Sequence, residues 1–80
     1  MHNQFTAQLR RLDNDQLVHR FNSEVGNPGW TTSRGKFLVA LTDEFLDRDI
    51  DISSIYSNNS LSLKYKVVMI DKVVLPIYLN

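Results

Sequence analysis

Residues 60–79 read SLSLKYKVVMIDKVVLPIYL, and this stretch decides the fold class. Its first half alternates apolar residues with Ser and Lys, which is the two-residue period of a half-buried β-strand. Asp71-Lys72 then offers a two-residue hairpin turn, and residues 73–79 return as a second strand. The stretch therefore predicts an antiparallel β-hairpin at residues 60–80.

Both faces of this predicted hairpin carry apolar residues. Val67 and Met69 fall on one face, whereas Val68 and Ile70 fall on the other. An isolated two-stranded hairpin is marginal in water, and the helices can cover only one of its faces. We therefore expect a second copy of the chain to cover the other face or to extend the sheet. Pro76 should turn its missing N–H away from the first strand, whose outer edge stays open for another strand.

Helical periodicity replaces this alternation in the residues before Asp49. The apolar spacing over residues 4–12 predicts a short amphipathic helix. Asp13 and Gln16 form the sequence pattern of a capping box, which starts a second helix at Asn14.

The second helix should end before Gly26, which is placed to adopt a positive φ just after the last turn. Residues 26–29, Gly-Asn-Pro-Gly, favour a type II turn. Thr31 or Thr32 can then cap a third helix that runs to about Asp47.

Apolar residues lie on two sides of this third helix. One stripe contains Phe37, Leu38, Leu41 and Phe45, and a second contains Gly35, Val39, Thr42 and Leu46. A helix that is apolar over so wide an arc should be covered on two sides. We expect Asp43, Glu44 and Asp47 on its exposed surface.

The 80 residues predict one small α+β domain, in which two or three N-terminal helices pack on a C-terminal antiparallel hairpin. The helical part spans residues 1–48, a connector spans 49–59, and the hairpin spans 60–80. The chain has no cysteine and therefore no disulfide. No apolar run approaches the roughly 20 residues that cross a membrane, and the first residues do not have the pattern of a signal peptide. We expect a cytoplasmic protein without a membrane partner.

The formal charge is zero but unevenly distributed, at +2 for residues 1–36, −4 for 37–57 and +2 for 58–80. Asp47, Asp49 and Asp51 have the spacing of the first three calcium-loop ligands. However, Ile52 stands where that loop needs glycine, and Asn58 stands where it needs glutamate. We therefore expect no metal site.

Catalytic chemistry has little support in this chain. There is no cysteine nucleophile, and the internal histidine, His19, lies opposite the apolar stripe of its helix. We expect neither an enzyme nor a cofactor-binding protein.

The leading hypothesis is a small non-enzymatic protein-interaction module that acts as a homodimer, because the apolar surface exceeds what so short a chain can bury. An unidentified protein partner could cover the same surface. The predicted interface comprises Val39, Leu46, Val68, Ile70, Val73 and Leu75.

The alternative is a small regulator that binds an anion or a nucleic acid at the start of the third helix, where free N–H groups and basic residues meet. Three acidic residues on that helix argue against nucleic acid. The predicted binding residues are Arg10, Arg11, Trp30, Thr31, Thr32, Arg34 and Lys36.

Overall fold

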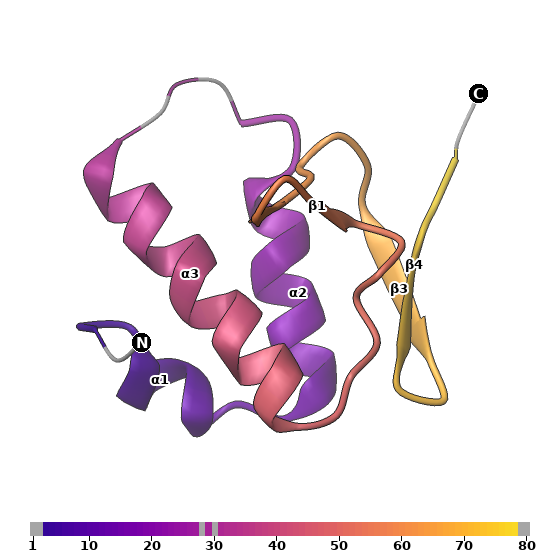
Figure 1. Cartoon of the computed structure of the whole chain (residues 1–80), viewed down its shortest axis with the longest axis horizontal. Helices are drawn as coiled ribbons and strands as arrows, with labels where there is room; N and C mark the ends of the chain where they lie inside the picture. The colour runs from indigo at the N-terminus through magenta and orange to yellow at the C-terminus, as the bar shows by residue number, and fades with distance from the viewer. Residues whose placement is uncertain (1–2, 28, 30, 79–80) are drawn as a thin grey trace.

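The computed structural model describes residues 3–27, 29 and 31–78, and in this part three helices are followed by two antiparallel strand pairs (Figure 1). This architecture confirms the predicted α+β class. The elements are α1 (Thr6–Arg10), α2 (Asn14–Glu24), α3 (Thr32–Asp47), β1 (Tyr56–Ser57), β2 (Ser60–Leu61), β3 (Val67–Ile70) and β4 (Val73–Pro76).

The predicted capping box at the start of α2 is confirmed. The backbone N–H of Gln16 donates to Asp13 Oδ1 at 2.8 Å, and the backbone N–H of Asp13 donates to Gln16 Oε1 at 2.9 Å. These two bonds satisfy N–H groups that the helix itself leaves without partners. At the other end of α2, Gly26 has a φ of 76°, as its predicted position requires.

The start of α3 also agrees with its prediction. Thr31 is the N-cap, and its Oγ1 accepts a hydrogen bond of 3.1 Å from the backbone N–H of Arg34. Gly29 has a φ of 89°. The predicted type II turn includes Pro28, and Trp30 follows it. Both residues lie outside the described part of the chain.

Helix α1 spans five residues, fewer than the predicted 4–12, and a helix of this length is not stable alone in water. It is held by tertiary contacts. Leu9 is fully buried, and the ring of Phe5 meets that of Phe37 edge-on, with centroids 5.5 Å apart. The side-chain amide of Asn3 donates to the backbone carbonyl of Lys36 at 2.8 Å. Together these contacts fix the beginning of the chain against α3.

The hydrophobic core lies between the three helices and the strand pairs. Ile50, Ile52 and Ile55 point inward, as expected for the connector. The largest side chains that are fully enclosed are Phe21, Phe45, Leu9, Leu17, Leu41, Ile50 and Val74.

The prediction of one long strand before Asp71 is wrong, because two short strands, β2 and β3, lie in this stretch. β2 pairs with β1 across a turn at Asn58-Asn59, and β3 pairs with β4. The last ladder bond between β3 and β4 runs from the N–H of Ile77 to the carbonyl of Lys66, at 2.8 Å. Ser62 still donates its N–H to the carbonyl of Ile55, but residues 63–65 have no facing strand in the described part of the chain. Alternation of side chains predicts a strand only where a partner backbone exists to pair with it.

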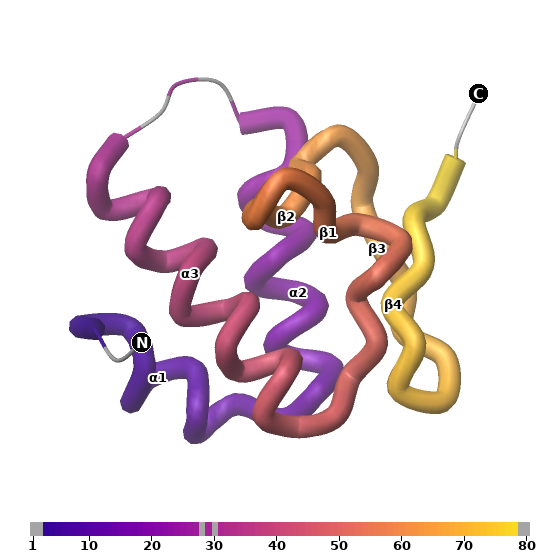
Figure 2. Tube along the Cα trace, in the orientation of Figure 1, coloured from indigo at the N-terminus to yellow at the C-terminus, as the bar shows by residue number. Residues whose placement is uncertain are grey.

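The β3–β4 hairpin agrees with its prediction in turn and direction. Asp71 and Lys72 have φ values of 50° and 62°, and two left-handed residues give the turn whose twist matches paired strands. The connector runs beside β4 (Figure 2). The N–H of Asp51 donates to the carbonyl of Lys72 at 2.8 Å, and the N–H of Val74 donates to the carbonyl of Asp51 at 2.9 Å. These bonds tie the hairpin to the end of α3.

Candidate functional site

The side of the β3–β4 hairpin that faces away from the helices is apolar and uncovered. Its four residues, which we call the outer hairpin face, are Val68, Ile70, Val73 and Leu75. Directly opposed residues share a face, and the register pairs Val68 with Leu75 and Ile70 with Val73. Val68 is 41% exposed and Ile70 is 55% exposed. The inner face, by contrast, buries Val67 and Val74 in the core.

The open strand edge predicted for the first strand is already occupied at Val67. The side chain of Asn22, on α2, accepts from the N–H of Val67 at 2.8 Å and donates to its carbonyl at 3.0 Å. One amide thus satisfies both backbone groups that another strand would bind there. On the opposite edge, Asp51 pairs with Val74, and Pro76 has no N–H to offer. Both edges of the hairpin are therefore blunted.

Val39 and Leu46, the other two predicted interface residues, lie on α3 and are exposed at 42% and 54%. At 100° per residue they fall on the side of α3 opposite to the buried Leu41. α3 packs against α1 and β2, whereas the hairpin packs against α2 through β3 (Figure 1). The six predicted residues therefore form two separate surfaces. Within the described part of the chain, the second apolar stripe of α3 is therefore left exposed at Val39 and Leu46.

Arg34, predicted to bind an anion, is engaged by the protein itself. Its guanidinium donates to the backbone carbonyl oxygens of Glu24, at 2.7 Å, of Asn27, at 2.9 Å, and of Gly29. Its Nε also lies 3.4 Å from the carboxylate of Glu24. The side chain holds the connection between α2 and α3 in place, and Arg20 and Glu24 line the hollow beside it together with Arg34.

Thr31 lies beside Arg34 at the start of α3, and Trp30 lies outside the described part of the chain, whereas Arg10 lies elsewhere. Arg10 lies near the end of α3, where its guanidinium is 3.8 Å from both Glu44 and Asp47. Ten residues of α3 separate Glu44 from Arg34, which is about 15 Å along the helix. Thr32 and Lys36 are exposed near the start of α3, and Arg11 is exposed just after α1. Among the described residues, the structure separates Arg10 from Thr31 and Arg34, and anion binding at the start of α3 stays a prediction.

Arg48 is a structural residue that the sequence analysis did not identify. Its guanidinium donates to the carbonyl oxygens of Leu9 (3.2 Å), Arg10 (3.3 Å) and Leu12 (2.7 Å), just where α1 ends. A helix leaves its last carbonyls without internal partners, so one forked cation closes the end of α1. No capping motif signals this role, because Arg48 lies far from α1 in sequence.

Glu44 is buried, although it was predicted to be exposed. Only 6% of its side chain is accessible, and its Oε2 accepts a 2.9 Å hydrogen bond from Nε of Arg48. A buried carboxylate needs such a partner to offset its lost hydration. The prediction was wrong because the end of α1 packs over this part of α3, and helical periodicity cannot show that contact.

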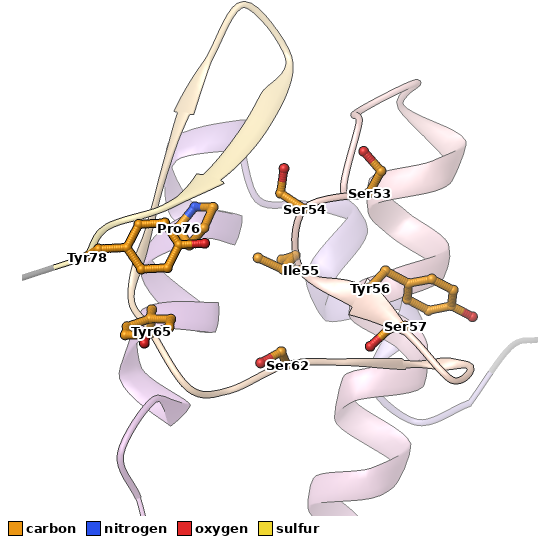
Figure 3. A pocket seen from close by; sticks show the side chains of 9 residues that line it. All are labelled: Ser53, Ser54, Ile55, Tyr56, Ser57, Ser62, Tyr65, Pro76 and Tyr78. Carbon is orange, nitrogen blue, oxygen red and sulfur yellow. The ribbon is translucent and has the colours of Figure 1, made fainter.

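A hollow of about 280 Å³ lies between the open end of the hairpin and the segment around β1 (Figure 3). Tyr65, Pro76 and Tyr78 form one wall, and serine hydroxyls form the other. The rings of Tyr65 and Tyr78 meet nearly at right angles, with centroids 4.7 Å apart. None of the lining residues carries a charged side chain.

Among residues 3–27, 29 and 31–78, no group of acidic or histidine side chains is arranged to hold a metal ion. A search of the same residues finds no helix with the length and apolar character needed to cross a membrane. The carboxyl of Asp51 has a lowered pKa, because the backbone N–H and the side chain of Ser53 bond to its charged form.

Comparisons with protein-family models, with curated proteins and with solved structures gave no match to this chain.

Proposed function

We propose that the protein is a non-enzymatic interaction module that acts as a homodimer through the outer hairpin face. The observation that carries this proposal is the pair of apolar cross-strand contacts, Val68 with Leu75 and Ile70 with Val73, in which the described residues leave all but the half-buried Val73 exposed. Single exposed apolar residues are ordinary on a protein surface, but a contiguous apolar group marks an interaction site.

The shape of the surface supports a protein partner over a small ligand. The four side chains stand on a short two-stranded ladder, whose paired strands give a surface rather than a cavity. Covering them removes apolar area from water at roughly 25 cal/mol per Å². A second copy is the simplest partner, because a two-fold contact uses the same apolar group on both sides. The lack of cysteine also supports our proposal of a cytoplasmic location.

The test is the mass in solution, measured by light scattering during size-exclusion chromatography over a hundredfold range of concentration. The monomer mass is 9.3 kDa. We expect the wild-type mass to rise toward twice this value as the concentration increases. Val68→Lys and Ile70→Lys should keep the mass at the monomer value, because each places a charge at the centre of the contact.

The chain offers matched controls for these substitutions. Val39 is exposed to nearly the same extent as Val68, and Leu46 to nearly the same extent as Ile70, but both controls lie on α3. Val39→Lys and Leu46→Lys should therefore dimerise like wild type. A wild-type protein that stays monomeric at every concentration would refute the proposal. If only Val39→Lys and Leu46→Lys abolished dimerisation, the interface would lie on α3 and not on the outer hairpin face.

A further inference from the structure

Two outer hairpin faces could meet in more than one arrangement, and the strand edges limit which arrangements are possible. Two copies can join hairpins edge to edge, which extends the sheet, or face to face, which stacks two sheets. Edge-to-edge pairing needs free N–H and C=O groups, and Asn22 occupies those of Val67 on the edge of β3. On the edge of β4, Asp51 and Pro76 remove the donors. Part of each edge is therefore blocked, whereas the outer hairpin face is open along its length, which favours a face-to-face contact.

Charges at the two ends of the hairpin differ in sign. The turn end carries Asp71 and Lys72, with Asp51 bridged beside Val73. The open end carries Lys64 and Lys66, and residues 52–70 contain no acidic residue. The net charge is thus −1 at the turn end and +2 at the open end.

Position along the strand places Lys66 beside the apolar face, and Asp71 follows Ile70 at the turn. Lys66 alternates with Val68 and Ile70, so its side chain leaves the strand on the outer side. Four residues of strand span about 13 Å, which exceeds the screening length of about 8 Å at physiological ionic strength. In a dimer, the charges at each end of the outer hairpin face therefore interact mainly with the charges directly opposite to them on the second copy.

We propose that two copies stack their outer hairpin faces with the hairpins antiparallel, so that the turn end of each copy lies against the open end of the other. This inference rests on the dimer proposed above. In this arrangement Asp71 faces Lys66 of the second copy twice, once on each side of the two-fold axis. The parallel arrangement would place Asp71 against Asp71 and Lys66 against Lys66. Like charges opposed in this way are unfavourable, so charge selects the antiparallel orientation.

The apolar group is small for an interface, because a standard interface uses about 20–30 residues on each side. The dimer is therefore weak, and its population depends on the protein concentration. In such a dimer, two ion pairs at the rim of the contact change the dissociation constant measurably. In such a contact the apolar residues provide the affinity and the charges at the ends provide the orientation.

Charge reversal tests the orientation. In the antiparallel dimer, Lys66→Glu places Glu against Asp71, and Asp71→Lys places Lys against Lys66. Each variant should raise the dimer dissociation constant roughly three- to tenfold, and the double variant should return it toward the wild-type value. In the parallel dimer, either reversal replaces one like-charged contact with another, so neither single variant should change the constant. Lys36→Glu, an exposed position on α3, is the matched control and should have no effect.

The salt dependence gives an independent reading on the unmodified protein. Raising NaCl from about 20 to 200 mM should weaken an antiparallel dimer, because screening reduces attraction between its ends. The same change should strengthen a parallel dimer, in which screening reduces repulsion. Circular dichroism and urea unfolding of each variant would confirm that it folds.

The outcomes separate the two proposals. A wild-type protein without any dimer refutes the proposed function and this inference together. If Val68→Lys abolishes the dimer, the proposed function stands. If, in addition, neither charge reversal weakens the dimer and salt strengthens it, the antiparallel orientation is overturned. Weakening by both single reversals and recovery in the double variant support it.

Discussion

The helical part of the chain and the β3–β4 hairpin differ in which side chains bind other parts of the protein and which face the solvent. In the helical part, Arg34 and Arg48 are directed at backbone carbonyl oxygens where the chain changes direction. In the hairpin, the strands satisfy most of their own backbone groups, and apolar side chains such as Ile70 face the solvent. Arg34 and Arg48 therefore hold the chain in place, whereas the outer hairpin face leaves apolar side chains exposed to solvent.

Removing the guanidinium of Arg48 should have the largest effect on stability. Arg48→Met removes three hydrogen bonds to the end of α1 and leaves the buried carboxylate of Glu44 without its closest partner. Loss of one member of a buried pair costs about 3 kcal/mol or more. Urea unfolding followed by circular dichroism measures this loss.

Two further variants define the origin of that effect. Arg48→Lys keeps the charge but not the forked donors, so its stability should lie between those of wild type and Arg48→Met. Arg11→Met changes an exposed arginine at the end of α1 and should shift stability by less than about 0.5 kcal/mol. Equal stability of Arg48→Met and Arg11→Met would show that Arg48 does not close α1.

Asn22 joins the two parts of the molecule, and its removal should have the next largest effect. Asn22→Ala leaves the N–H and the carbonyl of Val67 without side-chain partners. A backbone group left unsatisfied in a partly buried position costs about 1–3 kcal/mol. The amide of Val67 should also exchange with deuterium faster than in wild type, because the edge of β3 is opened.

Asn27→Ala is the matched control, because the side chain of Asn27 is exposed. It should neither change the urea midpoint appreciably nor accelerate exchange at Val67. Unchanged exchange at Val67 in Asn22→Ala would contradict the role of Asn22 as the group that occupies this edge.

Arg34 should contribute less than Asn22, since its carbonyl partners lie in an exposed connection where water can replace it. Arg34→Ala is expected to lower the free energy of unfolding by about 1–2 kcal/mol. Lys36→Ala, two residues later, should be nearly neutral because Lys36 is exposed. If Arg34 instead served an anion, its removal would leave stability unchanged and abolish stabilisation of the wild type by added phosphate.

Local sequence patterns predicted the parts of this fold that depend on neighbouring residues. The capping box at Asp13, the positive φ of Gly26 and the turn at Asp71-Lys72 each arise within a few positions of the chain. The exposed apolar character of Val68 and Ile70 also followed from the two-residue period, because their neighbours face the core. Whether these residues form an interface is the subject of the experiments proposed above.

The errors concern contacts between distant segments. Glu44 was placed on the surface because periodicity says nothing about α1 packing over it. The carbonyl partners of Arg34 could not be identified before the course of the chain was known, and the alternative of an anion site there stays a prediction. The strand across residues 62–65 was predicted without knowing that β4 would end before it. In each case the side-chain type was correctly noted, and its partner was the missing fact.

The smallest predicted effect concerns the carboxyl of Asp51, which is exposed and lies where the connector meets β4. Ser53 donates its backbone N–H to Oδ1 at 2.9 Å, and this bond lowers the pKa of Asp51 below its ordinary value of 3.8. A lowered pKa in the folded state stabilises the protein above the unfolded pKa, and this contribution disappears as the pH falls through the folded value. Asp51→Asn should therefore be slightly less stable than wild type at pH 7, with the difference vanishing toward pH 2. Ser53→Ala removes the side-chain hydrogen bond to Asp51 and keeps the backbone N–H, so carboxyl titration by NMR should show a slightly higher Asp51 pKa in the variant. An Asp51 pKa at its ordinary value in wild type would show that the Ser53 contact does not persist in solution, and that the bridge to β4 depends on backbone bonds alone.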